Sequence, residues 1–141
     1  MHPRGVAPVT GGLAVMPEPR PSVRLSTINM DCLNPDAMAA FYGKFLGWEI
    51  TWQDDDFILM RDPEGGTGVS FQAYPDYMPP TWPEEPGAQR KMIHLDIKVE
   101  DLEAAAAFAL ACGARFAEYQ GRDDLRVMLD PAGHPFCLFL H

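Results

Sequence analysis

The chain has 141 residues, 47% of them apolar, which is enough for one compact domain that can enclose a small cavity. Its formal net charge of −9, with no cluster of Lys or Arg, argues against nucleic acid or an anionic membrane as a partner. No apolar run reaches the length of a signal peptide or a transmembrane helix. Three cysteines at no metal-like spacing predict free thiols, and we expect a cytoplasmic protein.

The first part of the chain separates into a tail and a folded region. Residues 1–21 hold five prolines and three glycines without hydrophobic periodicity, which predicts a flexible tail. Residues 23–32 alternate between two faces and predict a strand with Thr27 on its polar side. Asn34 and Pro35 then have the residue types of a helix N-cap and first turn, and the helix that follows has a buried stripe ending at Phe45.

Three antiparallel strands are expected next, at 48–53, 57–61 and 69–74, separated by acidic and Asp-Pro-Glu-Gly turns. Residues 75–90 contain five prolines, so they cannot continue a sheet and predict a linker between two modules. An exposed linker has little reason to carry Tyr77 and Trp82. We therefore expect these two aromatic residues to pack over another part of the protein.

The second half repeats this order. Residues 91–99 alternate strictly, with His94 on the polar side, and Asp101 and Gly113 bound an alanine-rich helical segment. Further strands are expected near 114–119, 124–129 and 136–140.

The two halves align without a gap when Thr27 is placed on His94, and Asp-Pro-x-Gly recurs at 62–65 and 130–133. Such a repeat predicts an α+β fold of tandem βαβββ modules. Module one spans 22–74, the linker 75–90 and module two 91–141, and together they make up the domain at 22–141. Asn29 and Asp96 share one repeat position facing inward, where they either orient a ligand or face water.

Four segments resemble the vicinal oxygen chelate superfamily, which includes glyoxalase I, extradiol dioxygenases and bleomycin-resistance proteins, and most closely its glyoxalase-like domain group. They read NPDAMAAFYGKFLGW at 34–48, PDYMPPTWP at 75–83, HLDIKVEDL at 94–102 and DPAGHPFCL at 130–138. The resemblance covers about residues 22–140. It implies that the eight strands form a curved mixed sheet shaped like a cup, with one helix per module outside and a ligand or metal on the inner face. It also implies a homodimer, which would cover open sheet edges.

In metal-using members of this superfamily, four inward positions hold a divalent ion that chelates two neighbouring substrate oxygens. The matching positions here are Thr27, Gln72, His94 and Cys137. Only His94 is the usual ligand type, and a hydroxyl and a neutral amide are poor substitutes for imidazole and carboxylate. The sequence thus favours no metal cofactor. A divalent metal held by His94 and Gln72 remains the alternative.

His94 is either a hydrogen-bonded polar residue of the inner face or a donor, acceptor or general base toward an organic ligand. Cys137 is expected to act mainly as a small apolar filler, and His134 to have a turn or edge role. We expect Trp52 and Trp82 to line the cavity and stack on a flat ligand. The predicted ligand-binding set is therefore Thr27, Gln72, His94, Cys137, Trp52 and Trp82.

Two functions are compatible with these residues. The favoured hypothesis is a small-molecule-binding protein of the bleomycin-resistance type that sequesters a hydrophobic or aromatic compound without an intact metal site. The alternative is an enzyme of the glyoxalase lyase or extradiol dioxygenase class, in which His94 works with a metal or as a base. A structural protein with a filled cup is a third possibility, since one fold hosts many functions.

Overall fold

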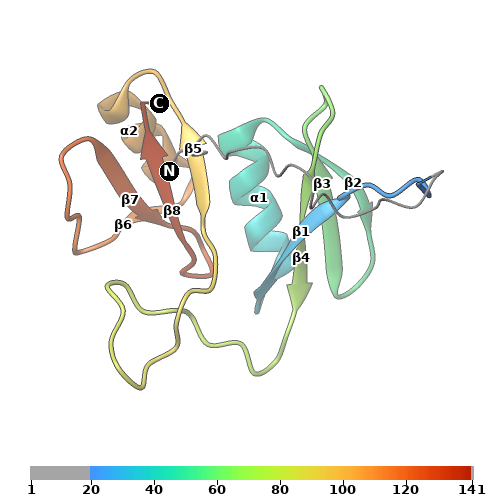
Figure 1. Ribbon diagram of the computed structural model, residues 1–141, viewed down its shortest axis with the longest axis horizontal. Coiled ribbons are helices and arrows are strands. Elements are labelled where there is room, and N and C mark those ends of the chain that lie inside the picture. The colour runs from blue at the N-terminus through green and yellow to red at the C-terminus, as the bar shows by residue number, and fades with distance from the viewer. Residues whose placement is uncertain (1–19, 141) are drawn as a thin grey trace, which may run out of the picture.

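The computed structural model describes residues 20–140, so the expected tail at 1–21 lies outside this range except for its last two residues. Eight strands form two four-stranded mixed sheets, ordered β1-β4-β3-β2 and β5-β8-β7-β6. The sheets stand side by side with α1 between them, and the linker passes beneath both (Figure 1). This arrangement confirms the α+β fold of two βαβββ modules.

The first module consists of β1 (Thr27–Cys32), α1 (Pro35–Leu46), β2 (Glu49–Gln53), β3 (Phe57–Arg61) and β4 (Gly68–Ala73). Asn34 caps α1 as predicted, because its side chain accepts a hydrogen bond from the Ala37 amide at 3.2 Å. Gly47 ends the helix in the left-handed region, at φ 72°. The parallel pairing of β1 with β4 places Asn29 opposite Ser70.

The second module consists of β5 (Leu95–Lys98), α2 (Leu102–Cys112), β6 (Arg115–Phe116), β7 (Leu125–Leu129) and β8 (Pro135–Phe139). The Asp101 side chain caps α2 by accepting from the Ala104 amide at 3.0 Å. β5 pairs in parallel with β8, which places Asp96 opposite Cys137. The two modules thus share one topology and the same parallel pairing of first and last strands.

Three strands are shorter than the sequence predicted by four residues or more. β1 begins at Thr27 because its partner β4 begins at Gly68, directly opposite. β5 begins at Leu95, opposite Phe136, since the preceding residue of β8 is Pro135, which has no N–H to donate. β6 has only two residues because the Gln120 side chain takes over its pairing, donating to the Val127 carbonyl and accepting from the Val127 amide, both at 2.9 Å.

One continuous core joins the modules, and α1 is at its centre. The side of each sheet that faces the helices is apolar, with Phe71 and Phe136 fully buried in one cluster. Tyr42 of α1 stacks on Phe71 with ring centroids 5.6 Å apart. The ring of Phe41 lies 5.7 Å from that of Phe136 in the second sheet. Because α1 packs against both sheets, the modules share a core and have a fixed relative position.

A buried polar link between the modules lies inside this core. The Tyr42 hydroxyl donates to Asp130 Oδ2 at 2.7 Å, and Asp130 Oδ1 accepts from the backbone amides of Ala132 and His134. Asp130 is fully buried, whereas its repeat counterpart Asp62 lies in an exposed turn of the same kind. Burial raises the pKa of Asp130, while the charge of His134 and the hydrogen bond from Tyr42 act in the opposite direction.

Tyr42→Phe is expected to lower the free energy of unfolding by about 1–3 kcal/mol, because Asp130 Oδ2 would lose its buried partner. Urea unfolding followed by circular dichroism measures this loss. Tyr119→Phe serves as the matched control, because Tyr119 is 54% exposed and should change stability by no more than about 0.5 kcal/mol. Equal stability of Tyr42→Phe and the wild type would contradict the role given to this bond.

Candidate functional site

The first module has a short row of polar side chains on the face of its sheet that looks away from α1. This first polar row consists of Thr27, Asn29 and Ser70. The Ser70 hydroxyl donates to Asn29 Oδ1 at 2.8 Å, and Thr27 Oγ1 lies 3.2 Å from Ser70 Oγ. Ser70 is fully buried, so its hydroxyl depends on these two partners. The three side chains of this row therefore hydrogen-bond to one another.

The second module carries different groups at the corresponding positions. This second polar row consists of His94, Asp96 and Cys137. His94 Nε2 lies 3.1 Å from Asp96 Oδ1, and one donor atom from each of the three residues lies within 4.8 Å of the others. The side chains of His94 and Asp96 are 29% and 37% exposed, while Cys137 is buried. An imidazole, a carboxylate and a thiol therefore meet at one partly open point.

The strand pairing defines which residues of the two rows correspond. Asn29 is opposite Ser70 and Asp96 is opposite Cys137, so Ser70 is the structural counterpart of Cys137. Gln72, which the sequence placed at that position, lies two residues further along β4. There it is opposite Asp31, and its amide approaches the Asp56 carbonyl at 3.4 Å.

Trp82 of the linker covers the inner face of the second sheet. It packs with Leu125 and Leu129 against the small cluster of Ala117, Val127 and Cys137. Its indole N–H donates to the Tyr119 carbonyl at 2.9 Å, and the Lys91 ammonium lies 4.8 Å from its ring centroid. The expectation that linker aromatics pack over another part of the protein therefore agrees with this placement.

The Cys137 thiol is held in its neutral form by this cover. Burial raises its pKa, the charge of Asp96 raises it further, and only Lys91 acts in the opposite direction. A protonated thiol is a weak nucleophile, so the free protein presents Cys137 as a packed side chain and not as an activated group.

Trp52 lies in a different environment from Trp82. It belongs to the edge strand β2, is 54% exposed, and meets only the edge of Phe57 among aromatic partners in the described part of the chain. Among residues 20–140, none covers this strand as Trp82 covers the second sheet, and its five residues are all exposed. The two sheets therefore differ in the described part of the chain. The linker covers the inner face of the second sheet, whereas the edge strand β2 of the first sheet is exposed.

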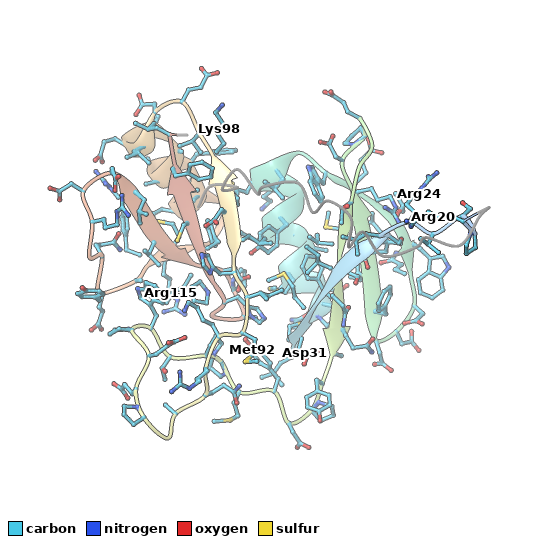
Figure 2. The ribbon with its side chains drawn as sticks, viewed as in Figure 1. Arg20, Arg24, Asp31, Met92, Lys98 and Arg115 are labelled. Atoms are coloured by element: carbon cyan, nitrogen blue, oxygen red, sulfur yellow. The ribbon has the colours of Figure 1, made fainter. Side chains whose placement is uncertain are left out.

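A cavity of about 310 Å³ opens between the modules, below the end of β1. Figure 2 shows Asp31 of β1 and Met92 of the segment before β5 close together in this region, and both line the cavity. Of the six predicted ligand-binding residues, only His94 lines it. The rest of the wall comes from the end of β1, the linker and the turn before β8: Ile28–Asp31, Tyr74, Asp76–Met78, Pro80, Gln89–Ile93, Leu95 and His134.

His134 and Tyr77 hold this wall together across the two modules. His134 Nε2 donates to the Asp31 carbonyl of β1 at 2.7 Å. The Tyr77 hydroxyl donates to the Ala132 carbonyl at 2.7 Å and lies 3.3 Å from His134 Nε2. A second cavity, of about 290 Å³, shares Tyr77 with the first and is lined by the start of α1 and residues 131–133. His134 thus connects the turn of module two to the first strand of module one.

This geometry accords with the comparisons with known proteins. The sequence model of a family described as Glyoxalase-like domain matches residues 27–139, and the chain belongs to this family. No curated protein matches the chain in sequence. No helix in residues 20–140 combines the length and apolar character needed to cross a membrane.

Solved structures share the fold at low sequence identity. A glyoxalase/bleomycin resistance protein/dioxygenase family enzyme from Burkholderia phytofirmans PsJN matches with a TM-score of 0.62 and 18% identity, over 82% of this chain and 97% of its own. Trypanothione-dependent glyoxalase I from Leishmania major matches at 0.58 and 16%, over 84% and 87%. A bleomycin resistance determinant encoded on the transposon Tn5 matches at 0.54 and 17%, over 84% and 98%. These likenesses confirm the fold predicted from the sequence.

The family's metal can be tested against the residues present. In the first module, the groups at the matching positions are a hydroxyl at Thr27 and a hydroxyl at Ser70, and they bond to each other and to Asn29. These groups are poor ligands for a divalent ion, and both hydroxyl protons are already engaged in hydrogen bonds. A four-ligand site that draws on both modules does not fit this chain.

Sequence reasoning missed two features of the site. Ser70 went unnoticed because only the strand register reveals that it is opposite Asn29. The cavity wall went unnoticed because residues 89–93 read as the end of a linker and the start of a strand, with no motif of their own. The sequence did indicate Asp96, because the alternation of polar and apolar residues placed its side chain on the same side of the strand as His94.

Trp82→Ala is expected to raise the rate at which Cys137 reacts with a thiol reagent by about tenfold or more, because the thiol would lose its cover. Peptide mapping by mass spectrometry follows each cysteine separately. Cys32, fully buried in the main core, should keep its rate in the same sample, and Trp52→Ala should leave Cys137 unchanged. An unaltered Cys137 rate in Trp82→Ala would contradict the covering role of Trp82.

Proposed function

We propose that the protein binds a small, largely apolar organic molecule in the cavity between its modules. The observation that carries this proposal is the cavity itself, whose volume of about 310 Å³ is at the lower end of the range for ligand pockets. Its wall combines apolar side chains, such as Met78 and Ile93, with polar and charged groups, among them His94 and Lys91. Apolar surface interrupted by polar groups is typical of sites that bind and orient small ligands.

The proposed function is the one that the sequence favoured, but the proposed binding site lies at a different place in the fold. The sequence placed a hydrophobic or aromatic ligand in the cup, against Thr27, Gln72, Cys137, Trp52 and Trp82. The closed first polar row and the cover of Trp82 leave less reason for a ligand there. His94 is the residue shared by both versions. Binding in the cavity uses groups of the protein and requires no ion.

A lyase or dioxygenase of the glyoxalase class is the second candidate, and one observation favours it. Asp96 Oδ1 lies 3.1 Å from His94 Nε2, close enough to orient the imidazole as a general base beside the cavity. If the protein is such an enzyme, His94→Ala should abolish turnover of a bound vicinal-oxygen compound while leaving its binding within a few-fold of wild type.

We further propose that the protein is a homodimer. The edge strands β2 and β6 lie on the outside of the two sheets, and Ile50 and Trp52 of β2 are exposed apolar residues that a second copy could cover. Sedimentation at micromolar concentration tests this, and a monomer at all concentrations would contradict it.

Ile93→Asp is expected to weaken binding of a small aromatic compound about tenfold or more, because losing one apolar contact costs about 1.5–3 kcal/mol and each 1.4 kcal/mol is tenfold in affinity. The measurement is a titration of the protein with a panel of small aromatic and aliphatic compounds, followed through backbone amide shifts in NMR spectra. Ile93 is 62% exposed, so its substitution should not disturb the core.

Ile50→Asp is the matched control, because Ile50 is also exposed, at 45%, and does not line the cavity. The compounds should shift amides of residues 28–31 and 89–95, and Ile50→Asp should bind them as the wild type does. Shifts confined to the surroundings of Trp52, or equal loss of binding in both variants, would contradict the proposed location.

A further inference from the structure

We propose that the second cavity binds a small organic carboxylate, with Arg115 holding the carboxylate and the rest of the wall holding the apolar body of the ligand. This cavity has a volume of about 290 Å³. Its wall comes from the start of α1, the linker, β6 and the turn at 131–133. It shares only Tyr77 with the cavity of the proposed function, so the two are separate sites.

Close contacts between the linker and the turn before β8 hold this wall in place. The Tyr77 hydroxyl donates to the Ala132 carbonyl at 2.7 Å. A Cβ atom on Gly133 would lie 2.9 Å from Pro79 Cβ, and the φ of Gly133 is 87°, so glycine is what allows the linker to approach this closely. Met38 of α1, which also lines the cavity, is buried in the core. The cavity therefore lies between parts of the chain that are packed against one another.

Apart from Arg115, the side chains of this wall carry no charge at neutral pH. Burial and the charge of Asp130 raise the pKa of the Cys32 thiol to about 11. Burial likewise raises the pKa of Tyr77. The other residues of the wall have no ionisable side chain. Arg115 is therefore the one charged group in a neutral and largely apolar wall.

The guanidinium of Arg115 is free to bind a ligand. Arg115 belongs to β6 and is exposed. Among residues 20–140 it forms no ion pair, whereas Arg122 and Arg126 of the same module are paired with Asp124 and Glu103. A guanidinium offers parallel N–H groups that match the two oxygens of a carboxylate. An unpaired arginine at the cavity therefore favours a carboxylate as the charged group of the ligand.

The surrounding charges indicate how the ligand lies. The negative charge of Asp130 acts on Cys32, so an anion is disfavoured in the buried part of the cavity. Cys32 and Met38 are fully buried there, and they suit an apolar group. The carboxylate then lies in the exposed part of the cavity, at Arg115. Benzoate, a flat ring with one carboxylate, combines both features.

The test is a titration of the full chain with benzoate and with benzamide, its neutral analogue of the same shape, followed through backbone amide shifts in NMR spectra. Benzoate should shift the amides of Ala37, Met38, Ala132 and Gly133, and should bind at least about tenfold more tightly than benzamide. Arg115→Gln should weaken benzoate binding about tenfold or more, because the charged hydrogen bonds are lost. Acetate, which has the carboxylate without the ring, should also bind at least about tenfold more weakly than benzoate.

Arg24→Gln is the matched control and should bind benzoate as the wild type does. Arg24 is also exposed and has no ion-pair partner in the described part of the chain, and Figure 2 shows it beside the first sheet, away from Arg115. Ile93→Asp alters the other cavity and should likewise leave benzoate binding in the second cavity unchanged.

Four results would overturn the proposal. They are the absence of benzoate-induced shifts, equal affinity for benzoate and for either benzamide or acetate, unchanged benzoate binding in Arg115→Gln, and shifts confined to residues 28–31 and 89–95. The last result would place benzoate in the first cavity and so would support the proposed function. Failure of the first cavity to bind any compound would leave this test unaffected, because benzoate binding is followed at residues that line only the second cavity.

Discussion

The buried contact between Tyr42 and Asp130 is the constraint on which the rest of the structure depends. Asp130 belongs to the second module and Tyr42 to the helix of the first, and the 2.7 Å bond between them lies inside the shared core. An unpaired carboxylate at this depth would be costly, so its partners must stay in place. The same turn presents His134 to the Asp31 carbonyl, which fixes the wall of the cavity. The contact that unites the modules therefore also shapes the space between them.

The two modules have one topology but different inner faces. In the first, two hydroxyls and an amide hydrogen-bond to one another. In the second, an imidazole, a carboxylate and a thiol come together, and Trp82 packs against the thiol. The strand pairing that places Ser70 opposite Asn29 is the same that places Cys137 opposite Asp96. The repeated backbone thus places equivalent residues at equivalent positions. The side chains at those positions decide whether the polar groups hydrogen-bond to one another or remain able to bind a ligand. His94 lies both in the second polar row and on the cavity wall.

Local signals in the sequence predicted most of the fold. The caps at Asn34 and Asp101 and the alternation around His94 act within a few residues, and the repeat of the Asp-Pro-x-Gly turns gave the module order. The site was harder to predict because it depends on pairings distant in sequence. Alternation shows which side of a strand a residue takes but not its partner, so Gln72 was chosen where the register places Ser70. Likewise, nothing near Asp130 signals that Tyr42, 88 residues away, would bury it.

The central claim is that the modules form one cooperative unit, so that the cavity between them is a lasting feature of the protein. Native-state hydrogen exchange measured residue by residue tests it most directly, because it reports the free energy of opening for each buried amide. The account predicts that the amides of Phe71 in β4 and Leu138 in β8 open with free energies that agree within about 0.5 kcal/mol, both through global unfolding. A β7–β8 region that opens at a much lower free energy than β3–β4 would contradict it, since the second module would then separate while the first stayed folded.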